Sequence, residues 1–199
     1  GKTYDWNALH PLLTAAIRAV DTQTPILVGA ENYSNVSWLP HLVPSSDSRT
    51  VYAVHTYAPM TYTHQTPPLV LQYPGMMPVD EGGPQQMVDA AWLAGQLQPV
   101  RDFMARYEAP VAVNEFGVQR YQPSAAGYLN DVLTALEDSG VNHALWLWAS
   151  SWGPQGDVDD FDLTHGPDPA NHQLVPDNPL LQVIQSAWAR NTVRPANGR

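Results

Sequence analysis

Three short segments of the sequence carry side chains that can do acid–base or sugar-binding chemistry. His55 and Tyr57 end one apolar run, Glu115 ends another within Asn-Glu-Phe-Gly, and Trp146 and Trp148 lie in a third. Each run is short, rich in apolar residues and bounded by turn residues, which is typical of a buried strand. A carboxylate, a phenol and an imidazole can together support nucleophilic or general acid–base catalysis. An indole offers a flat apolar face with one polar edge.

The strands that would hold these residues alternate with helical segments. We expect strands at residues 25–29, 49–57, 110–117 and 143–149, and helices at 5–20, 36–43 (weak), 86–107, 124–139 and 180–190. Long proline-rich loops are expected at 60–84 and from 150 to 179. Strands that alternate with helices pair in parallel, because a parallel pair needs a crossover connection. The pattern predicts an α/β protein, and a doubly wound sheet and part of a (β/α)8 barrel both fit it.

In either architecture the functional residues lie where the strands end, at the carboxyl edge of the sheet. Simple alternation along each strand places Val113 with Glu115 and Ala53 with His55. We therefore expect these four side chains to face the same side. On each strand the small or branched residue then comes before the functional residue along that face.

Composition excludes several classes of partner and cofactor. The 199 residues contain 9 basic and 19 acidic side chains, a net charge of −10, and Lys2 is the only lysine. Such a field repels phosphates, so nucleic acid and membrane surfaces are not expected as partners. The absence of cysteine removes disulfides and thiolate metal sites. Residues 1–199 are expected to form a single domain, and no cofactor is expected.

The order of these motifs resembles glycoside hydrolase family 5, the cellulases, mannanases and related β-glycanases. The matching parts are His-x-Tyr at 55–57, the Asn-Glu-Phe-Gly segment and the Trp-Leu-Trp segment at 146–148. The run YDWNALHPLLTAAIRAVDTQTPILVGAENYSN is similar to the family's passage from helix 4 into strand 5. The resemblance covers residues 4 to about 195, and it implies the C-terminal half of a (β/α)8 (TIM) barrel, strands 5 to 8.

The resemblance also implies roles for individual residues. Glu115 would be the nucleophile of a retaining cellulase that cleaves β-1,4-glucan, with Tyr57 hydrogen-bonded to it and His55 ordering the site. Trp146 would floor the subsite where the bond is cut, and Trp148 competes for that role. Further expected substrate-binding residues are Asn114, Tyr33, Trp38, Tyr62 and Trp152. By resemblance the protein would be secreted.

One part of the family pattern is missing from this chain. The family's acid/base glutamate lies in an Asn-Glu-Pro segment at the end of strand 4, and the sequence contains no Asn-Glu-Pro. Half a barrel leaves two open strand edges. We expect a second copy, as in a homodimer, or a separate N-terminal half to complete it. Glu31, after the first strand, is the candidate for a substitute acid.

Other interpretations of the same residues remain open. Within the same chemistry, mannan or another β-glycan is an alternative substrate. From another class, the chain is a non-catalytic truncated half-barrel that self-associates or only binds glycan. The acidic segment 157–162 lacks the EF-hand pattern, because Phe161 stands where an oxygen ligand belongs, and we interpret it as a solvated loop. The seven histidines show no metal-ligand spacing, so no metal site is expected.

Overall fold

The computed structural model describes residues 5–148 and 156–191. The chain divides into two compact units, which are treated separately below. The first comprises residues 1–56, 95–116 and 136–144, and the second comprises 57–94, 117–135 and 145–199. Within the described part of the chain, no helix is both long enough and apolar enough to span a membrane.

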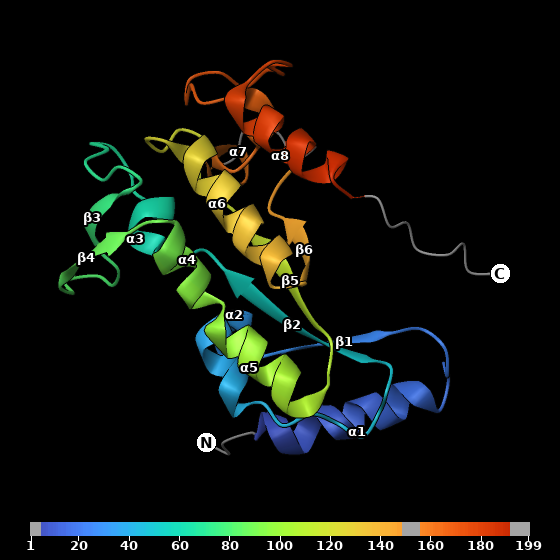
Figure 1. Ribbon diagram of the computed structural model, residues 1–199. Helices are drawn as coiled ribbons and strands as arrows, with labels where there is room; N and C mark the ends of the chain where they lie inside the picture. The colour runs from blue at the N-terminus through green and yellow to red at the C-terminus, as the bar shows by residue number, and fades with distance from the viewer. Residues whose placement is uncertain (1–4, 149–155, 192–199) are drawn as a thin grey trace. The chain divides into compact units, whose positions relative to one another are not determined.

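The first unit is built on a four-stranded sheet in the order β1-β2-β5-β6 (Figure 1). These strands are β1 (Ile26–Gly29), β2 (Thr50–Thr56), β5 (Val111–Phe116) and β6 (Asn142–Leu145). β2 pairs in parallel with both β1 and β5. Long segments separate the paired strands in the sequence, as parallel pairing requires. The expected α/β fold with a parallel sheet is thus confirmed.

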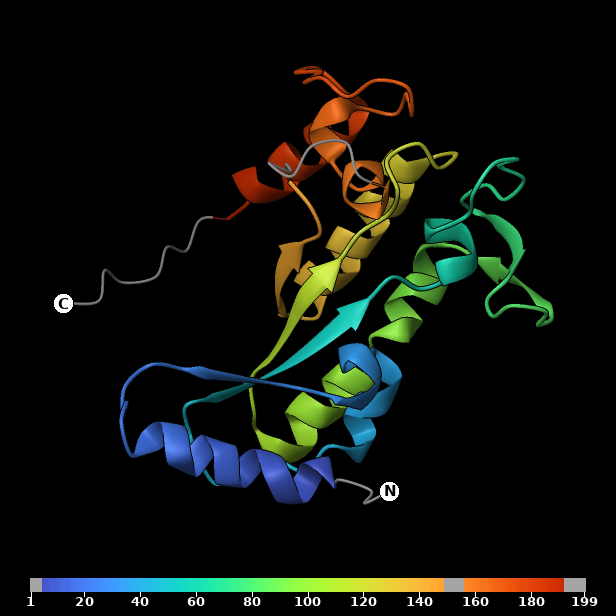
Figure 2. The same ribbon diagram turned by 180° about the vertical axis from the view of Figure 1, so that it is seen from behind.

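Helices of the first unit pack beside this sheet. α1 (Trp6–Arg18) lies alongside β1 (Figure 2), and the Trp6 indole donates a hydrogen bond to the Gly29 carbonyl, 2.9 Å away. Asp5 caps the helix by accepting from the backbone of Asn7. The remaining helices of this unit are α2 (Glu31–Ser34), the 3-10 helix η1 (Val36–His41) and α5 (Gln98–Tyr107).

Apolar packing joins α5 to the sheet. The rings of Tyr52 on β2 and Phe103 on α5 meet edge to face, with centroids 5.2 Å apart. Val54 of β2 and Val113 of β5 are fully buried. These residues define the core face of the sheet in the first unit. Because side chains alternate along a strand, their neighbours on each strand point to the opposite face.

The second unit holds a two-stranded antiparallel ribbon, several helices and a long C-terminal segment. Its elements are α3 (Met60–Thr63), β3 (Gly75–Pro78), β4 (Gln85–Val88), α4 (Ala90–Gln96), α6 (Ala125–Asp138), α7 (Gly156–Asp160), η2 (Leu163–His165) and α8 (Pro179–Ala189), although α4 and α6 end in residues of the first unit. Tyr62, Tyr73 and Tyr128 pack together in its core, with ring centroids 5.4–6.1 Å apart. Burial raises the pKa of each of these three phenols.

Four of the sequence-based expectations need correction. The segment 60–84 was expected to be a loop, but it contains α3 and β3. The expected helix 86–107 is instead strand β4 followed by α4 and α5. The expected strand 143–149 ends at Leu145. Short helical turns, α7 and η2, also interrupt the expected loop from 150 to 179.

Candidate functional site

The carboxyl ends of β2 and β5 bring His55 and Glu115 together in the first unit. His55 Nδ1 lies 3.4 Å from Glu115 Oε2. Their side chains are 25% and 31% exposed, so both are partly desolvated yet remain open to a ligand. An imidazole that contacts one carboxylate oxygen restrains the rotation of the glutamate side chain. The arrangement therefore holds a carboxylate at the sheet edge where α/β proteins bind their ligands.

An irregularity in β5 produces this pairing. Val113 pairs with Val54, but the next pair along the strands is Glu115 with His55, so Asn114 is an extra residue. Directly paired residues face the same side of a sheet, and Val54 and Val113 belong to the buried core face. The bulge moves Glu115 to the face that carries His55. The expectation that Val113 and Glu115 share a face by simple alternation is wrong, although Glu115 and His55 do lie together.

Asn114 lies in the bulge itself. Its Oδ1 atom is buried and has no hydrogen-bond partner among the described residues. Nearly all buried polar atoms in proteins are paired, and the exceptions call for an explanation such as a functional role. The substrate-binding role expected for Asn114 stays a prediction, and this orphaned oxygen is consistent with it.

A second feature of the same unit lies just beyond β1. An open hollow of about 440 Å³ is lined by Trp6 and by residues 29–34, Glu31 and Tyr33 among them. Asn32, Tyr33 and Ser34 all have left-handed backbone conformations, with φ of 53°, 56° and 59°. Such conformations are costly for residues with a Cβ and concentrate at functional sites. The turn leaves Tyr33 93% exposed, so its ring is free to meet a ligand.

Glu31 is also exposed at this turn, but β2 lies between β1 and β5 in the sheet. Glu31 and Glu115 therefore follow strands that are not neighbours. The use of Glu31 as a substitute acid stays a prediction.

Two of the expected tyrosines lie in the second unit. Tyr57 follows β2, and its ring packs edge-on against His64 and Phe161, with centroids 5.3 and 5.7 Å away. Its hydrogen bond to Glu115 stays a prediction. Tyr62 is 0% exposed, and its hydroxyl donates to the Pro123 carbonyl. A ring enclosed on all sides cannot bind sugar, so the expected substrate-binding role of Tyr62 is wrong.

The expected tryptophan platforms fall in different surroundings. Trp38, on η1, is partly exposed and meets His41 edge-on. Trp146 and Trp148 belong to the expected strand 143–149 but lie beyond the end of β6. Trp148 packs against Trp188 of α8, with ring centroids 5.1 Å apart, while Trp146 is half-buried. Trp152 lies outside the described residues.

Sequence reasoning missed a polar cluster in the second unit. Arg120 is fully buried, and its Nη2 donates to Oδ2 of Asp159 across 3.0 Å. His165 and His172 contact the same carboxylate. Burial alone would raise the pKa of Asp159, but the hydrogen bond and charge of Arg120 and the two imidazoles outweigh burial and lower it.

Segment 157–162 was the available signal for this cluster. Asp159 and Asp162 are 5% and 1% exposed, so its interpretation as a solvated loop is wrong at both positions. Charged residues are almost never buried unless they are paired. His165 and His172 follow Asp159 within 13 residues and were part of that signal. Arg120 lies 39 residues before Asp159, and the sequence does not relate it to the segment.

Comparison with known proteins places this geometry in a family. Residues 1–151 match the family model described as cellulase (glycosyl hydrolase family 5). Endoglucanase C of Acetivibrio thermocellus is 24% identical over 165 residues, which cover 71% of this chain and 48% of that protein. The chain thus spans about half the length of this relative.

Solved structures show the same fold. A GH5-4 broad-specificity endoglucanase from Bacteroides salanitronis matches with a TM-score of 0.69 at 17% identity, over 92% of this chain and 49% of that one. A hyperthermophilic endo-β-1,4-glucanase solved with substrate matches with a TM-score of 0.68 at 19% identity, over 91% and 54%. The parallel sheet and its helices therefore form part of a (β/α)8 barrel. Since the family model covers most of its residues, the chain belongs to glycosyl hydrolase family 5.

Proposed function

We propose that this chain carries the nucleophile of a retaining glycoside hydrolase that cleaves β-1,4-glucan, and that the nucleophile is Glu115. The observation that supports this most is the contact of Glu115 with His55 at the carboxyl ends of adjacent parallel strands. The family match supports a hydrolase of glycosidic bonds, and the relatives named above are endoglucanases.

In the proposed reaction a Glu115 oxygen attacks the anomeric carbon of the glycan. The bond to the leaving oxygen breaks as that oxygen takes a proton from a carboxylic acid, and a glycosyl ester forms on Glu115. A water molecule, deprotonated by the same group, then attacks the anomeric carbon and releases Glu115. Two inversions leave the configuration unchanged. His55 acts as a positioning residue, because its Nδ1 contacts Oε2 of the attacking carboxylate.

The source of the acid is part of the proposal. The chain has no Asn-Glu-Pro segment, and Glu31 follows a strand that is not adjacent to β5. We propose that a second copy or a separate N-terminal half completes the barrel. The acid would come from the N-terminal half, because a second copy has no Asn-Glu-Pro segment either. Cleavage of mannan and glycan binding without catalysis are the competing proposals, and the experiment below separates them.

An activated substrate tests the nucleophile without needing the acid. A dinitrophenyl 2-deoxy-2-fluoro-β-cellobioside has a leaving group that departs without protonation, and its fluorine slows hydrolysis of the ester. We expect intact mass spectrometry to show one fluorocellobiosyl unit per chain, and peptide mapping to place it on Glu115. Glu115→Gln should give no adduct, whereas the matched change Glu31→Gln should leave labelling unchanged.

Labelling on any other residue, or equal labelling of Glu115→Gln, would overturn the assignment of the nucleophile. Labelling by the corresponding mannosyl probe alone would favour mannan as substrate. A folded chain that binds cellobiose but is labelled by neither probe would support the non-catalytic alternative.

A further inference from the structure

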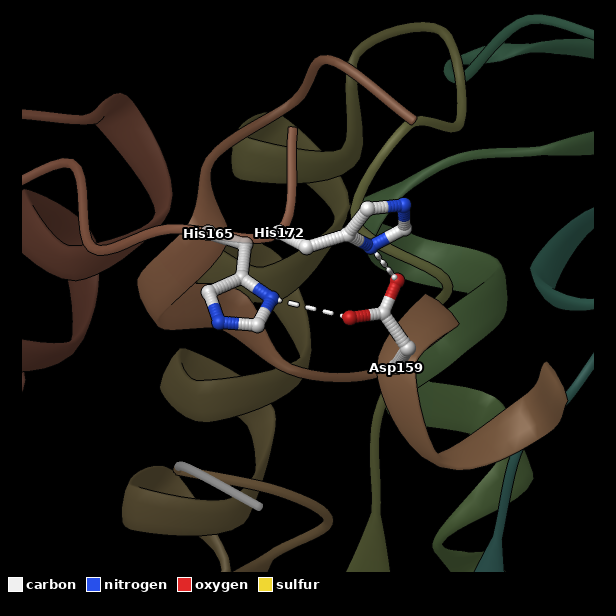
Figure 3. A group of neighbouring side chains, drawn as sticks. All are labelled: Asp159, His165 and His172. Atoms are coloured by element: carbon white, nitrogen blue, oxygen red, sulfur yellow. Dashed lines mark hydrogen bonds and ion pairs between the residues drawn. The ribbon is translucent and has the colours of Figure 1, made fainter. Parts of the chain in front are cut away.

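Three side chains of the second unit point their polar atoms toward one another (Figure 3). Asp159 lies in α7, His165 ends η2, and His172 follows on the next loop. His165 Nδ1 lies 2.9 Å from Asp159 Oδ1, and His172 Nδ1 lies 2.9 Å from Asp159 Oδ2. The ligand atoms of all three residues lie within 4.8 Å of one another.

We propose that Asp159, His165 and His172 form a binding site for a divalent transition-metal ion of the zinc class. Two imidazole nitrogens and one carboxylate oxygen suit Zn²⁺, whereas Mg²⁺ and Ca²⁺ prefer oxygen ligands throughout. Zinc bonds of about 2.0–2.1 Å place tetrahedral ligand atoms about 3.3 Å apart. Each histidine Nδ1 lies 2.9 Å from an oxygen of Asp159, and one donor atom of each residue lies within 4.8 Å of the others, so side-chain adjustment can bring the three donors around one ion. Three protein ligands leave a fourth position for water.

Arg120 holds the carboxylate of Asp159 in an orientation suited to binding a metal ion. Its guanidinium donates to Asp159 Oδ2 and also to the backbone carbonyls of Asp159, Gly166, Asp168 and Pro169. These bonds fix both the side chain of Asp159 and the loop that carries the histidines. Oδ1 accepts no bond from Arg120, so it can face an ion while Oδ2 stays with the guanidinium. Outer hydrogen bonds of this kind orient the ligands of metal sites.

If each histidine binds the metal through Nδ1, the proton on its Nε2 can reach a hydrogen-bond acceptor or solvent. A neutral histidine that binds metal through Nδ1 carries its proton on Nε2. For His165, Nε2 lies 3.7 Å from Asp162 Oδ2, so a small rotation makes a hydrogen bond to this carboxylate. Asp162 is held in turn by the backbone and hydroxyl of Thr164. The side chain of His172 is 47% exposed, so its Nε2 proton can face solvent. A carboxylate behind a histidine is the usual support of a zinc ligand.

The charge balance of the cluster also favours a cation. The buried carboxylates of Asp159 and Asp162 outnumber the single guanidinium of Arg120, so with neutral imidazoles these groups carry one net negative charge. A divalent ion changes the net charge of these groups from −1 to +1. It would also link α7, η2 and the loop that holds His172. The chain's net charge of −10 attracts cations toward the site.

Zinc titration of the full chain tests the site. Isothermal calorimetry should show one Zn²⁺ per chain, and the melting temperature should rise with Zn²⁺ but not with Mg²⁺. His172→Gln keeps a hydrogen-bonding side chain at Asp159 but removes a ligand, and we expect affinity to fall at least tenfold. Asp162→Asn should weaken binding about 10-fold, at the lower end of outer-partner effects. The matched change His41→Gln, at a histidine of the first unit, should leave binding unchanged.

Cobalt provides a spectroscopic check. Co²⁺ should give the visible absorption of a site with nitrogen ligands, and His172→Gln should lose it. Equal Zn²⁺ affinity in the wild type, His172→Gln and His41→Gln would overturn the proposal. The cluster would then be a hydrogen-bonded structural contact without a metal. The site is independent of the proposed catalysis, so Glu115→Gln should bind Zn²⁺ as the wild type does.

Discussion

At the scale of single residues, Glu115 meets His55 because β5 contains one residue more than β2 across the same interval. Without that bulge, His55 would pair with Asn114, and Glu115 would face the buried side with Val54 and Val113. A carboxylate there would lose solvation without gaining a ligand. The bulge is therefore what places the carboxylate on the face available to a ligand, as bulges next to active sites commonly do.

Tyr62→Phe separates a core role from a sugar-binding role. The change removes the hydroxyl that donates to the buried Pro123 carbonyl at 2.7 Å. An unsatisfied buried carbonyl costs about 1–3 kcal/mol, so the free energy of unfolding should fall by about that much in urea titrations. Glycan binding should be unchanged. The control Tyr33→Phe, at an exposed ring, should leave stability unaltered. Loss of glycan binding by stable Tyr62→Phe would contradict the core assignment.

Residue types and sequence spacing were enough to select Glu115 and His55, because both stand at the ends of recognisable strands. They were not enough to give the face of Glu115, since a bulge depends on the register with the neighbouring strand. The burial of Tyr62 was equally out of reach. It depends on packing with Tyr73, across a loop, and with Tyr128, which is distant in sequence.

At the scale of elements, the strands of the parallel sheet and three of the helices were predictable, whereas the antiparallel ribbon and the helix break near residue 97 were not. α1, α6 and α8 follow their apolar periodicity, and Gly140 ends α6 with the positive φ expected of a C-terminal cap glycine. β3 and β4 have few β-branched residues, and β3 includes a proline. Their pairing with each other forms the ribbon, and local propensity carries no sign of that pairing.

Gly117, the residue after β5, tests how closely two segments of the second unit approach. A Cβ at this position would collide with the Trp146 carbonyl oxygen and lie 3.3 Å from the Phe161 ring. Gly117→Ala should therefore lower the free energy of unfolding by about 1–3 kcal/mol. Gly95→Ala is the matched control, because open space surrounds that position within α4, and it should stabilise by about 0.4–1 kcal/mol. Equal effects of the two changes in thermal or urea unfolding would refute the close approach.

The link between α1 and the segment before β2 should depend on pH. Arg18 donates to both oxygens of Asp47, and this hydrogen-bonded pair lowers the pKa of Asp47 below its ordinary 3.8. A lowered pKa in the folded state contributes stability above pH 4, and that contribution is lost as pH falls through the folded pKa. Asp47→Asn should therefore be less stable than the wild type at pH 7, and the difference should shrink below pH 4.

Unfolding midpoints measured from pH 7 to pH 2.5 check this expectation. Asp177→Asn, at an exposed aspartate, serves as the control and should track the wild type throughout. A difference for Asp47→Asn that grows as the pH falls would have the wrong sign for this ion pair.

At the scale of the whole molecule, charge and exposed apolar surface act in opposite directions. The net charge of −10 keeps copies of the chain apart. α1 nevertheless exposes Leu12, Leu13 and Ile17, and it lies beside β1, a strand at the edge of the sheet. An exposed apolar stripe next to an unpaired strand edge is a surface for association. Our proposal that another polypeptide completes the barrel applies to this surface.

Self-association with a defined salt dependence follows if a second copy completes the barrel. The Debye length falls from about 30 Å at 0.01 M salt to about 3 Å at 1 M, so salt screens repulsion between two copies but leaves apolar burial intact. Sedimentation velocity should therefore show a monomer–dimer equilibrium that shifts toward the dimer as salt rises. Leu12→Lys should weaken the dimer, whereas Leu174→Lys, at an exposed leucine of the second unit, should not. A monomer at every salt concentration would exclude the second copy and favour a separate N-terminal half, because the apolar stripe would then need a different partner.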